Sequence, residues 1–242
     1  MSLVARPRLD YLARMLPRAA EIRDEYQRLR QVQRALNSKL VKTLTKKAIE
    51  QSARDLDLWE DGKIVLQHED HMGVLADYAI YEYRVAGKSA VERCAARSHG
   101  AEGTDEGLVI EAMLNARFTL VSIQKIVPQV GAQVVDHIYG DRFLLADVGL
   151  SQTGARGDLL ATRLLPLPRF TMTSGAPLAF DPELATWILE GVGAGSGDLA
   201  TLRLIARKQR KHMARTIIAL AMEDPALVKV AWRENVAGRG AG

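Results

Sequence analysis

The stretch from Arg117 to Gly175 constrains the fold more than any other part of this chain. It is rich in Val, Ile, Leu and Thr and is interrupted at short intervals by Gly and Pro, which is typical of a run of short strands. On either side, apolar residues recur at steps of three or four, the spacing of a helix with one buried face. The pattern predicts an α+β protein with N-terminal helices, a small mostly antiparallel β-barrel or sheet, and C-terminal helices.

About five strands are expected in these roughly 60 residues, a size that suits a small SH3-like or OB-like barrel. An open antiparallel sheet covered by the flanking helices is the alternative. Gly140 and Asp141 separate two of the strands, and Gly at the first of two turn positions predicts a type II′ hairpin. The last strand is short and is expected at an edge. The expected strands are Phe118–Ile126, Gln133–Tyr139, Arg142–Asp147, Leu159–Leu165 and Phe170–Thr173.

The chain divides into a helical region at 1–116, a small β-domain at 117–180, C-terminal helices at 181–236 and a disordered tail at 237–242. The apolar periodicity of residues 8–45 predicts one long helix. Ser89 and Glu92 have the spacing of a capping box, and Thr104 is expected to cap the next helix. The turn at 61–62 precedes a lone strand at 63–67. A helix after it is expected to bury Met72, Leu75, Ala79 and Tyr83.

The charges are distributed unevenly, although the net charge is only +4. Residues 1–54 hold 13 basic and 5 acidic residues, whereas residues 55–116 hold 5 basic and 13 acidic ones. Residues 199–242 are basic again, with 9 against 3. Either the basic ends pack against the acidic middle, or they form a basic surface for an anionic partner such as a nucleic acid.

The segment Leu199–Met222 predicts a helix that is both buried and basic. It contains six basic residues and no acidic ones, while Leu202, Ala206 and Ile217 belong to an apolar face. We expect a non-enzymatic binding module that contacts a nucleic acid or a ribonucleoprotein through phosphates, because aromatic residues for base stacking are few. The candidate nucleic-acid-binding residues are Arg203, Arg207, Lys208, Arg210, Lys211 and Arg215.

A protein–protein adaptor or self-associating scaffold that uses the long N-terminal helix is the main alternative. An enzyme is the third possibility. Asp136 and His137 beside Asp141 suggest acid–base chemistry, and Ser151 and Ser174 are conceivable nucleophiles, but nothing in the sequence places them together.

No metal and no cofactor are expected. His68 and His71 have a spacing of three residues, but capping carboxylates with surface histidines explain this segment better than a metal site does. A single cysteine, Cys94, excludes an intrachain disulfide. Neither a signal peptide nor a membrane-spanning run is visible, so the expected location is the cytoplasm.

Three segments carry a resemblance: the run from Trp59 to Glu92 with DYAIYEYR, then NARFTLVSIQKIVP, then GDLLATRLLPLPRFTMTSGAPL. They resemble an uncharacterised family of bacterial proteins, some of which are associated with a C-terminal cysteine cluster of the SEC-C type. The resemblance covers residues 55–190 and implies no activity or catalytic residue. This chain lacks the cysteines of such a cluster, so a zinc role is not implied for it.

Overall fold

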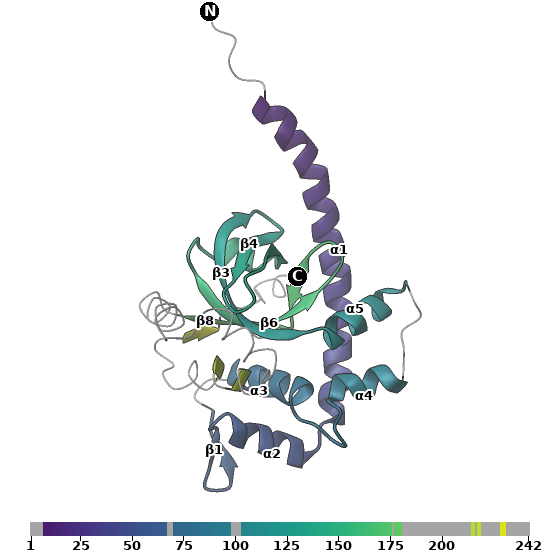
Figure 1. Cartoon of the computed structure of the whole chain (residues 1–242), viewed down its shortest axis with the longest axis vertical. Helices are drawn as coiled ribbons and strands as arrows, with labels where there is room; N and C mark the ends of the chain where they lie inside the picture. The colour runs from purple at the N-terminus through teal and green to yellow at the C-terminus, as the bar shows by residue number, and fades with distance from the viewer. Residues whose placement is uncertain are drawn as a thin grey trace, which may run out of the picture.

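The structure is a computed structural model that describes residues 7–66, 70–97, 103–175, 177–180, 214–215, 217–218 and 228–230. Within these ranges, helices pack against a small β-barrel (Figure 1), which confirms the α+β class and the expected barrel. Most of the expected C-terminal helices lie outside the described residues. The helices that precede the barrel in the described ranges are α1 (Pro7–Thr43), α2 (Lys46–Asp55), α3 (Asp70–Tyr81), α4 (Ala90–Arg97) and α5 (Asp105–Leu114).

Side-chain caps start two of these helices where the sequence predicts them. At α4, Glu92 N donates to Ser89 Oγ at 3.2 Å, and Ser89 N donates to Glu92 Oε2 at 2.6 Å. This is the reciprocal arrangement of a capping box, which satisfies two amides that have no helical partner. At α5, Gly107 N donates to Thr104 Oγ1 at 3.2 Å. Both predicted caps are therefore confirmed.

Helix α3 buries Leu75 and Ala79 as predicted, but not Met72, and Tyr83 lies beyond the end of the helix and is partly buried. Val74, Leu75, Tyr78 and Ala79 are buried, whereas Met72 is 47% exposed. At about 100° per residue, Met72 lies roughly 90° around the helix from the centre of the buried face. The prediction that Met72 points inward was wrong.

The segment after α2 forms a hairpin, not a lone strand. Strand β1 (Trp59–Glu60) pairs antiparallel with β2 (Lys63–Ile64). The two turn residues both have positive φ, 44° at Asp61 and 81° at Gly62. An Asp-Gly pair with positive φ at both positions is favoured in a tight type I′ turn, which explains why the chain reverses here.

A closed five-stranded barrel follows, with the strand order β3-β4-β5-β7-β6 and a pairing of β6 back to β3. The β5–β7 pairing is parallel, and the other four are antiparallel. This order is an OB-type Greek key, whereas an SH3-like barrel is an antiparallel meander. Short strands β8 and β9 extend the sheet beyond β6. The barrel elements are β3 (Arg117–Val127), β4 (Gly131–Asp136), β5 (Arg142–Ala146), α6 (Leu150–Thr153), β6 (Leu159–Pro166) and β7 (Thr171–Thr173), followed by β8 (Leu178–Phe180) and β9 (Val228–Val230).

The hairpin between β4 and β5 is present, but its predicted two-residue turn is wrong. Asp136 N donates to Asp141 O at 2.9 Å and Gly140 N donates to Asp136 O at 2.8 Å, so the loop consists of residues 137–140. The Asp136 carboxylate causes this, because its Oδ1 accepts from the backbone amides of Ile138 and Tyr139, both at 2.9 Å. Gly140 does have positive φ, at 79°.

The last barrel strand is not at an edge, as the sequence suggested. Strand β7 lies between β5 and β6, and Met172 and Thr173 are buried. The barrel closes only if this strand bridges β5 and β6, which is a requirement of tertiary topology that short-range patterning does not contain.

Three apolar clusters hold the helices and barrel together. The first fills the barrel and includes Val121, Val134 and Leu145. The second joins α2 and α3 to the outer faces of β3 and β6. The third joins α1, α4 and α5 to β5 and β7. Because β6 contributes to all three clusters, it is apolar on both faces, which explains its nearly continuous sequence LLATRLLP.

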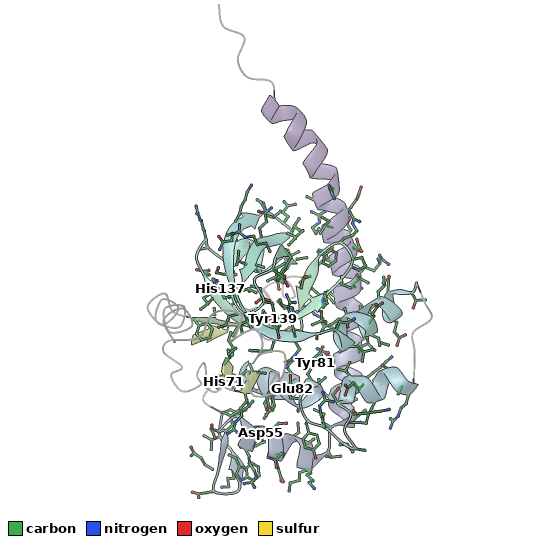
Figure 2. All side chains as sticks on the ribbon, in the orientation of Figure 1. Asp55, His71, Tyr81, Glu82, His137 and Tyr139 are labelled. Atoms are coloured by element: carbon green, nitrogen blue, oxygen red, sulfur yellow. The ribbon has the colours of Figure 1, made fainter. Side chains whose placement is uncertain are left out.

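A buried arginine interrupts this apolar strand and ties it to α3. Arg163 Nε donates to Asp77 Oδ2 and Arg163 Nη1 donates to Glu82 Oε1, both at 2.9 Å. Its guanidinium also lies over the Tyr81 ring, 4.2 Å from the ring centroid. Burial alone would lower the pKa of Arg163, but the two carboxylates outweigh burial and raise it above the ordinary value. Tyr81 and Glu82 are labelled in Figure 2.

We predict that Gly131→Ala destabilises the protein by about 3 kcal/mol or more, because a β-carbon there would lie 2.0 Å from the Leu145 carbonyl oxygen. Gly73→Ala in α3 is the matched control, since its β-carbon would meet nothing within 4 Å. The control should gain roughly 0.5 to 1 kcal/mol, because alanine favours helix. Urea unfolding measures both changes. Equal midpoints for the two variants would contradict the close approach of Gly131 on β4 to the backbone of β5.

Candidate functional site

The outer face of the first three barrel strands carries polar side chains in register. Strand β4 is central, and Val135 pairs with Ser122 on one side and with Arg142 on the other. One step along, Gln133 pairs with Lys125 and with Leu144. Directly paired residues share a face of the sheet. We call this surface the barrel face; it consists of Ser122, Gln124, Lys125, Gln133, Val135 and Arg142.

Two cations on the barrel face have no acidic partner among the described residues. Lys125 and Arg142 are exposed, and no ion pair in the described part of the chain includes either of them. Lys125 lies on β3 and Arg142 on β5, with β4 between them, and Arg142 is two residues along β5 from Leu144, the position level with Lys125. Their Cα atoms are therefore about 12 Å apart. Exposed cations without local counter-ions attract an external anion more strongly than paired ones do.

Other arginines are already neutralised by the chain itself. Arg28 of α1 forms a salt bridge with Asp105, and Arg117 pairs with Asp136 at 3.0 Å and Asp141 at 2.7 Å. The pairing of Arg28 with an acid of the middle segment fits the first interpretation of the charge pattern, in which basic ends pack against acidic residues. The uneven charge of the sequence therefore does not by itself mark these arginines as a binding surface.

Ser122, the buried member of the barrel face, forms a hydrogen-bonded pair with His137. His137 Nε2 lies 2.8 Å from Ser122 Oγ, and Gln124 Nε2 donates to the same hydroxyl oxygen at 2.9 Å. Burial lowers the pKa of His137, and the Asp136 carboxylate opposes this effect only partly. The imidazole is therefore mainly neutral at pH 7, so its Nε2 can accept a hydrogen bond from the Ser122 hydroxyl. His137 is labelled in Figure 2.

The acid–base group suggested by the sequence does not assemble around this pair. Asp136 Oδ1 accepts from Thr119 Oγ1 at 2.6 Å and from two loop amides, so this oxygen holds the β4–β5 loop. Ser151 Oγ donates to Val148 O within its own turn, and Ser174 is buried beside α1. Among the described residues, no further hydrogen bond orients the His137 ring as the third group of a catalytic triad would.

Ser122 was missed as a candidate by the sequence reasoning. Its neighbours Val121 and Ile123 fill the barrel, so the alternation of β3 places Ser122 outside. That alternation is visible in the sequence, but the partner is not, because His137 lies 15 residues away across a strand pairing.

Of the six predicted nucleic-acid-binding residues, the structure describes Arg215. Arg203, Arg207, Lys208, Arg210 and Lys211 lie outside the described residues. Arg215 is half-exposed, and its Nη2 is 3.9 Å from Asp57 Oδ1, so an acid of the middle segment faces it. Ile217, a residue of the predicted apolar face, is buried together with Ala214 in the cluster that contains α2 and α3.

The histidine segment before α3 is only partly described. His68 and Glu69 lie outside the described residues, and His71 is buried at the beginning of α3. In the described ranges, no group of three or more His, Cys, Asp or Glu side chains is arranged to hold a metal ion. Cys94 is half-buried and packs against the cluster formed by α1, α4 and α5.

These observations define the class: an α+β protein in which an OB-type barrel packs against helices. The chain belongs to a family of unknown function (DUF7986), whose profile matches residues 20–194, well over half of its length. The match confirms an uncharacterised family but not the resemblance to SEC-C-associated proteins. No curated protein and no solved structure matches the chain. In the described helices, none is long and apolar enough to cross a membrane.

We predict that His137 titrates below the ordinary histidine pKa of about 6.5, because burial disfavours the imidazolium. The unfolded chain then binds the proton more readily, so His137 should contribute stability above about pH 6.5 that is lost as the pH falls towards its folded pKa. NMR titration of the imidazole protons, assigned with His137→Gln, measures the pKa. A value at or above 6.5 would contradict the buried pairing with Ser122.

Proposed function

We propose that this protein is a non-enzymatic binding module that contacts a nucleic acid, free or within a ribonucleoprotein, through its phosphates. The observation that carries the proposal is the barrel face, where Lys125 and Arg142 have no acidic partner in the described chain. Exposed Gln124 and Gln133 add amide donors to the same surface. In OB folds, the face of the second and third strands is where oligonucleotides commonly bind.

The positions of the aromatic residues favour phosphate contacts over base stacking. Phe118 and Phe170 are buried in the clusters that join the barrel to the helices. Tyr139 is partly buried and covered by the Arg117 guanidinium, 4.4 Å from its ring centroid. A base-stacking platform needs exposed rings along a groove, and these three rings do not supply one. Affinity should therefore depend strongly on salt and weakly on sequence.

The basic C-terminal segment is proposed as the second half of the same interface. Its residues Arg203, Arg207, Lys208, Arg210, Lys211 and Arg215 are the candidates named from the sequence. Arg203, Arg207 and Arg210 are spaced to lie in one row on a helix, where they repel each other unless an anion lies against them. Arg215 already faces Asp57, so we expect its contribution to be the smallest of the six.

A protein–protein adaptor or self-associating scaffold is the second candidate. It is supported by α1, whose N-terminal part projects away from the helices and barrel (Figure 1). A projecting helix offers its surface to a partner or to a second copy. Analytical ultracentrifugation of the full chain and of a variant beginning at Arg18 tests self-association, because the same number of copies per particle in both would remove its support.

The proposal also includes a cellular location and a family relationship. A cytoplasmic location is supported by the single cysteine, and cell fractionation tests it. Kinship with SEC-C-associated proteins is supported by the DYAIYEYR segment and the strand sequences that resemble theirs. A relative that combines these segments with a cysteine cluster would establish that kinship, and a family alignment without such a chain would remove it.

The nucleic-acid proposal predicts a specific salt effect. Lys125→Gln/Arg142→Gln should weaken binding to a fluorescent RNA of about 20 nucleotides and flatten its log–log salt dependence by about two units, one for each lost phosphate contact. Arg207→Gln/Arg210→Gln/Lys211→Gln should act in the same direction. Fluorescence anisotropy across a salt series measures both effects.

Lys46→Gln/Lys63→Gln is the matched control, since it removes two positive charges from exposed positions on α2 and β2. An equal loss in the control would show that net charge alone governs binding. If the unmodified protein shows no salt-sensitive binding to RNA or DNA at about 50 mM ionic strength, the proposal fails and the adaptor takes its place.

A further inference from the structure

Arg169, in the loop between β6 and β7, is held by two carboxylates of α1. Glu25 Oε2 accepts from Arg169 Nη1 at 3.0 Å, and Glu21 Oε2 accepts from Nη2 at 3.2 Å. The two glutamates lie one helical turn apart, so both reach the same guanidinium. The Arg169 side chain is 42% exposed, so its contact with the glutamates is accessible from solvent.

The geometry of this contact resembles that of a bound phosphate. Each terminal nitrogen of the arginine fork receives one oxygen, which is how a guanidinium binds two oxygens of a single phosphate. Here the two oxygens come from two different side chains. The group of three carries a net charge of −1, so an incoming phosphate meets repulsion as long as both glutamates remain ionised and in place.

Neighbouring contacts place this group at the end of the barrel. Arg23 Nη1 donates to Gln129 Oε1 at 2.9 Å, which connects α1 to the β3–β4 loop. Tyr26 meets Phe170 edge-to-face, with 6.4 Å between the ring centroids. Residues 21–26 of α1 therefore lie across both the β3–β4 loop and the β6–β7 loop. In OB folds these two loops flank the surface that takes the ligand.

We propose that Arg169 is a phosphate-binding residue of this interface, and that Glu21 and Glu25 occupy it in place of the phosphate when no ligand is bound. This inference rests on the proposed function and adds a specificity determinant to it. A ligand must displace two carboxylates to reach Arg169, so weakly charged anions are rejected and a polyanion is favoured. The exchange replaces one set of charge-assisted hydrogen bonds with another, and Lys125 and Arg142 supply the additional attraction.

Glu21→Gln/Glu25→Gln tests the inference. The variant should bind the same fluorescent RNA of about 20 nucleotides some 3- to 10-fold more tightly at about 50 mM ionic strength, and its log–log salt slope should steepen by about one unit. Adding Arg169→Gln to this variant should remove the gain, because the released cation is then absent. Arg169→Lys should keep part of it, since lysine retains the charge but not the fork.

The control is Glu60→Gln/Asp61→Asn, which makes the same change in net charge on exposed residues of the β1–β2 hairpin, far from the N-terminal part of α1 (Figure 1). An equal gain in this control overturns the inference, as does a gain that persists in the variant without Arg169. If the unmodified protein binds RNA and Glu21→Gln/Glu25→Gln binds no better, the inference fails while the proposed function stands. If none of the variants binds, both fail.

Discussion

The arrangement of helices and barrel depends on the buried charge of Arg163. The Arg163 side chain is only 3% exposed, and burying its charged guanidinium costs free energy unless hydrogen-bonded anions accompany it. Asp77 of α3 and Glu82, the residue that follows this helix, supply these anions, and the guanidinium lies over the rings of Tyr81 and Phe118. Because the charges are satisfied only when α3 lies against β6 in one position, they specify the orientation of the helices more narrowly than apolar contact does.

A second set of polar contacts positions α1 against the barrel, at the end of β7. Arg30 Nη1 donates to Thr173 O and Gln33 Nε2 donates to Ser174 O, both at 2.7 Å. The leucines of the α1 face, including Leu29, Leu36 and Leu40, are buried beside them. The C-terminal half of α1 is therefore part of the core. This anchoring determines where the preceding turns lie, which brings Glu21 and Glu25 onto Arg169.

The sequence predicted best those features that depend on residues a few positions apart. The capping box of Ser89 and Glu92 forms as predicted, because both partners lie within one turn of helix. The predicted β4–β5 turn was wrong for a related reason, since the Asp136 side chain competes for the backbone amides of its own loop. The position of β7 inside the barrel was also missed, because closure joins strands that lie far apart in the chain.

The sequence by itself determined the α+β class and the number of short strands expected in the barrel, because β-prone runs and the turn residues between them are local features of the chain. It did not determine which cations are available. Arg169 and Lys125 look alike in the sequence, yet Arg169 is paired with Glu25, 144 residues away, and Lys125 pairs with no acid in the described chain. Only the tertiary structure decided this difference, because an ion pair forms where the fold brings two charges within a few ångströms, whatever their separation along the chain.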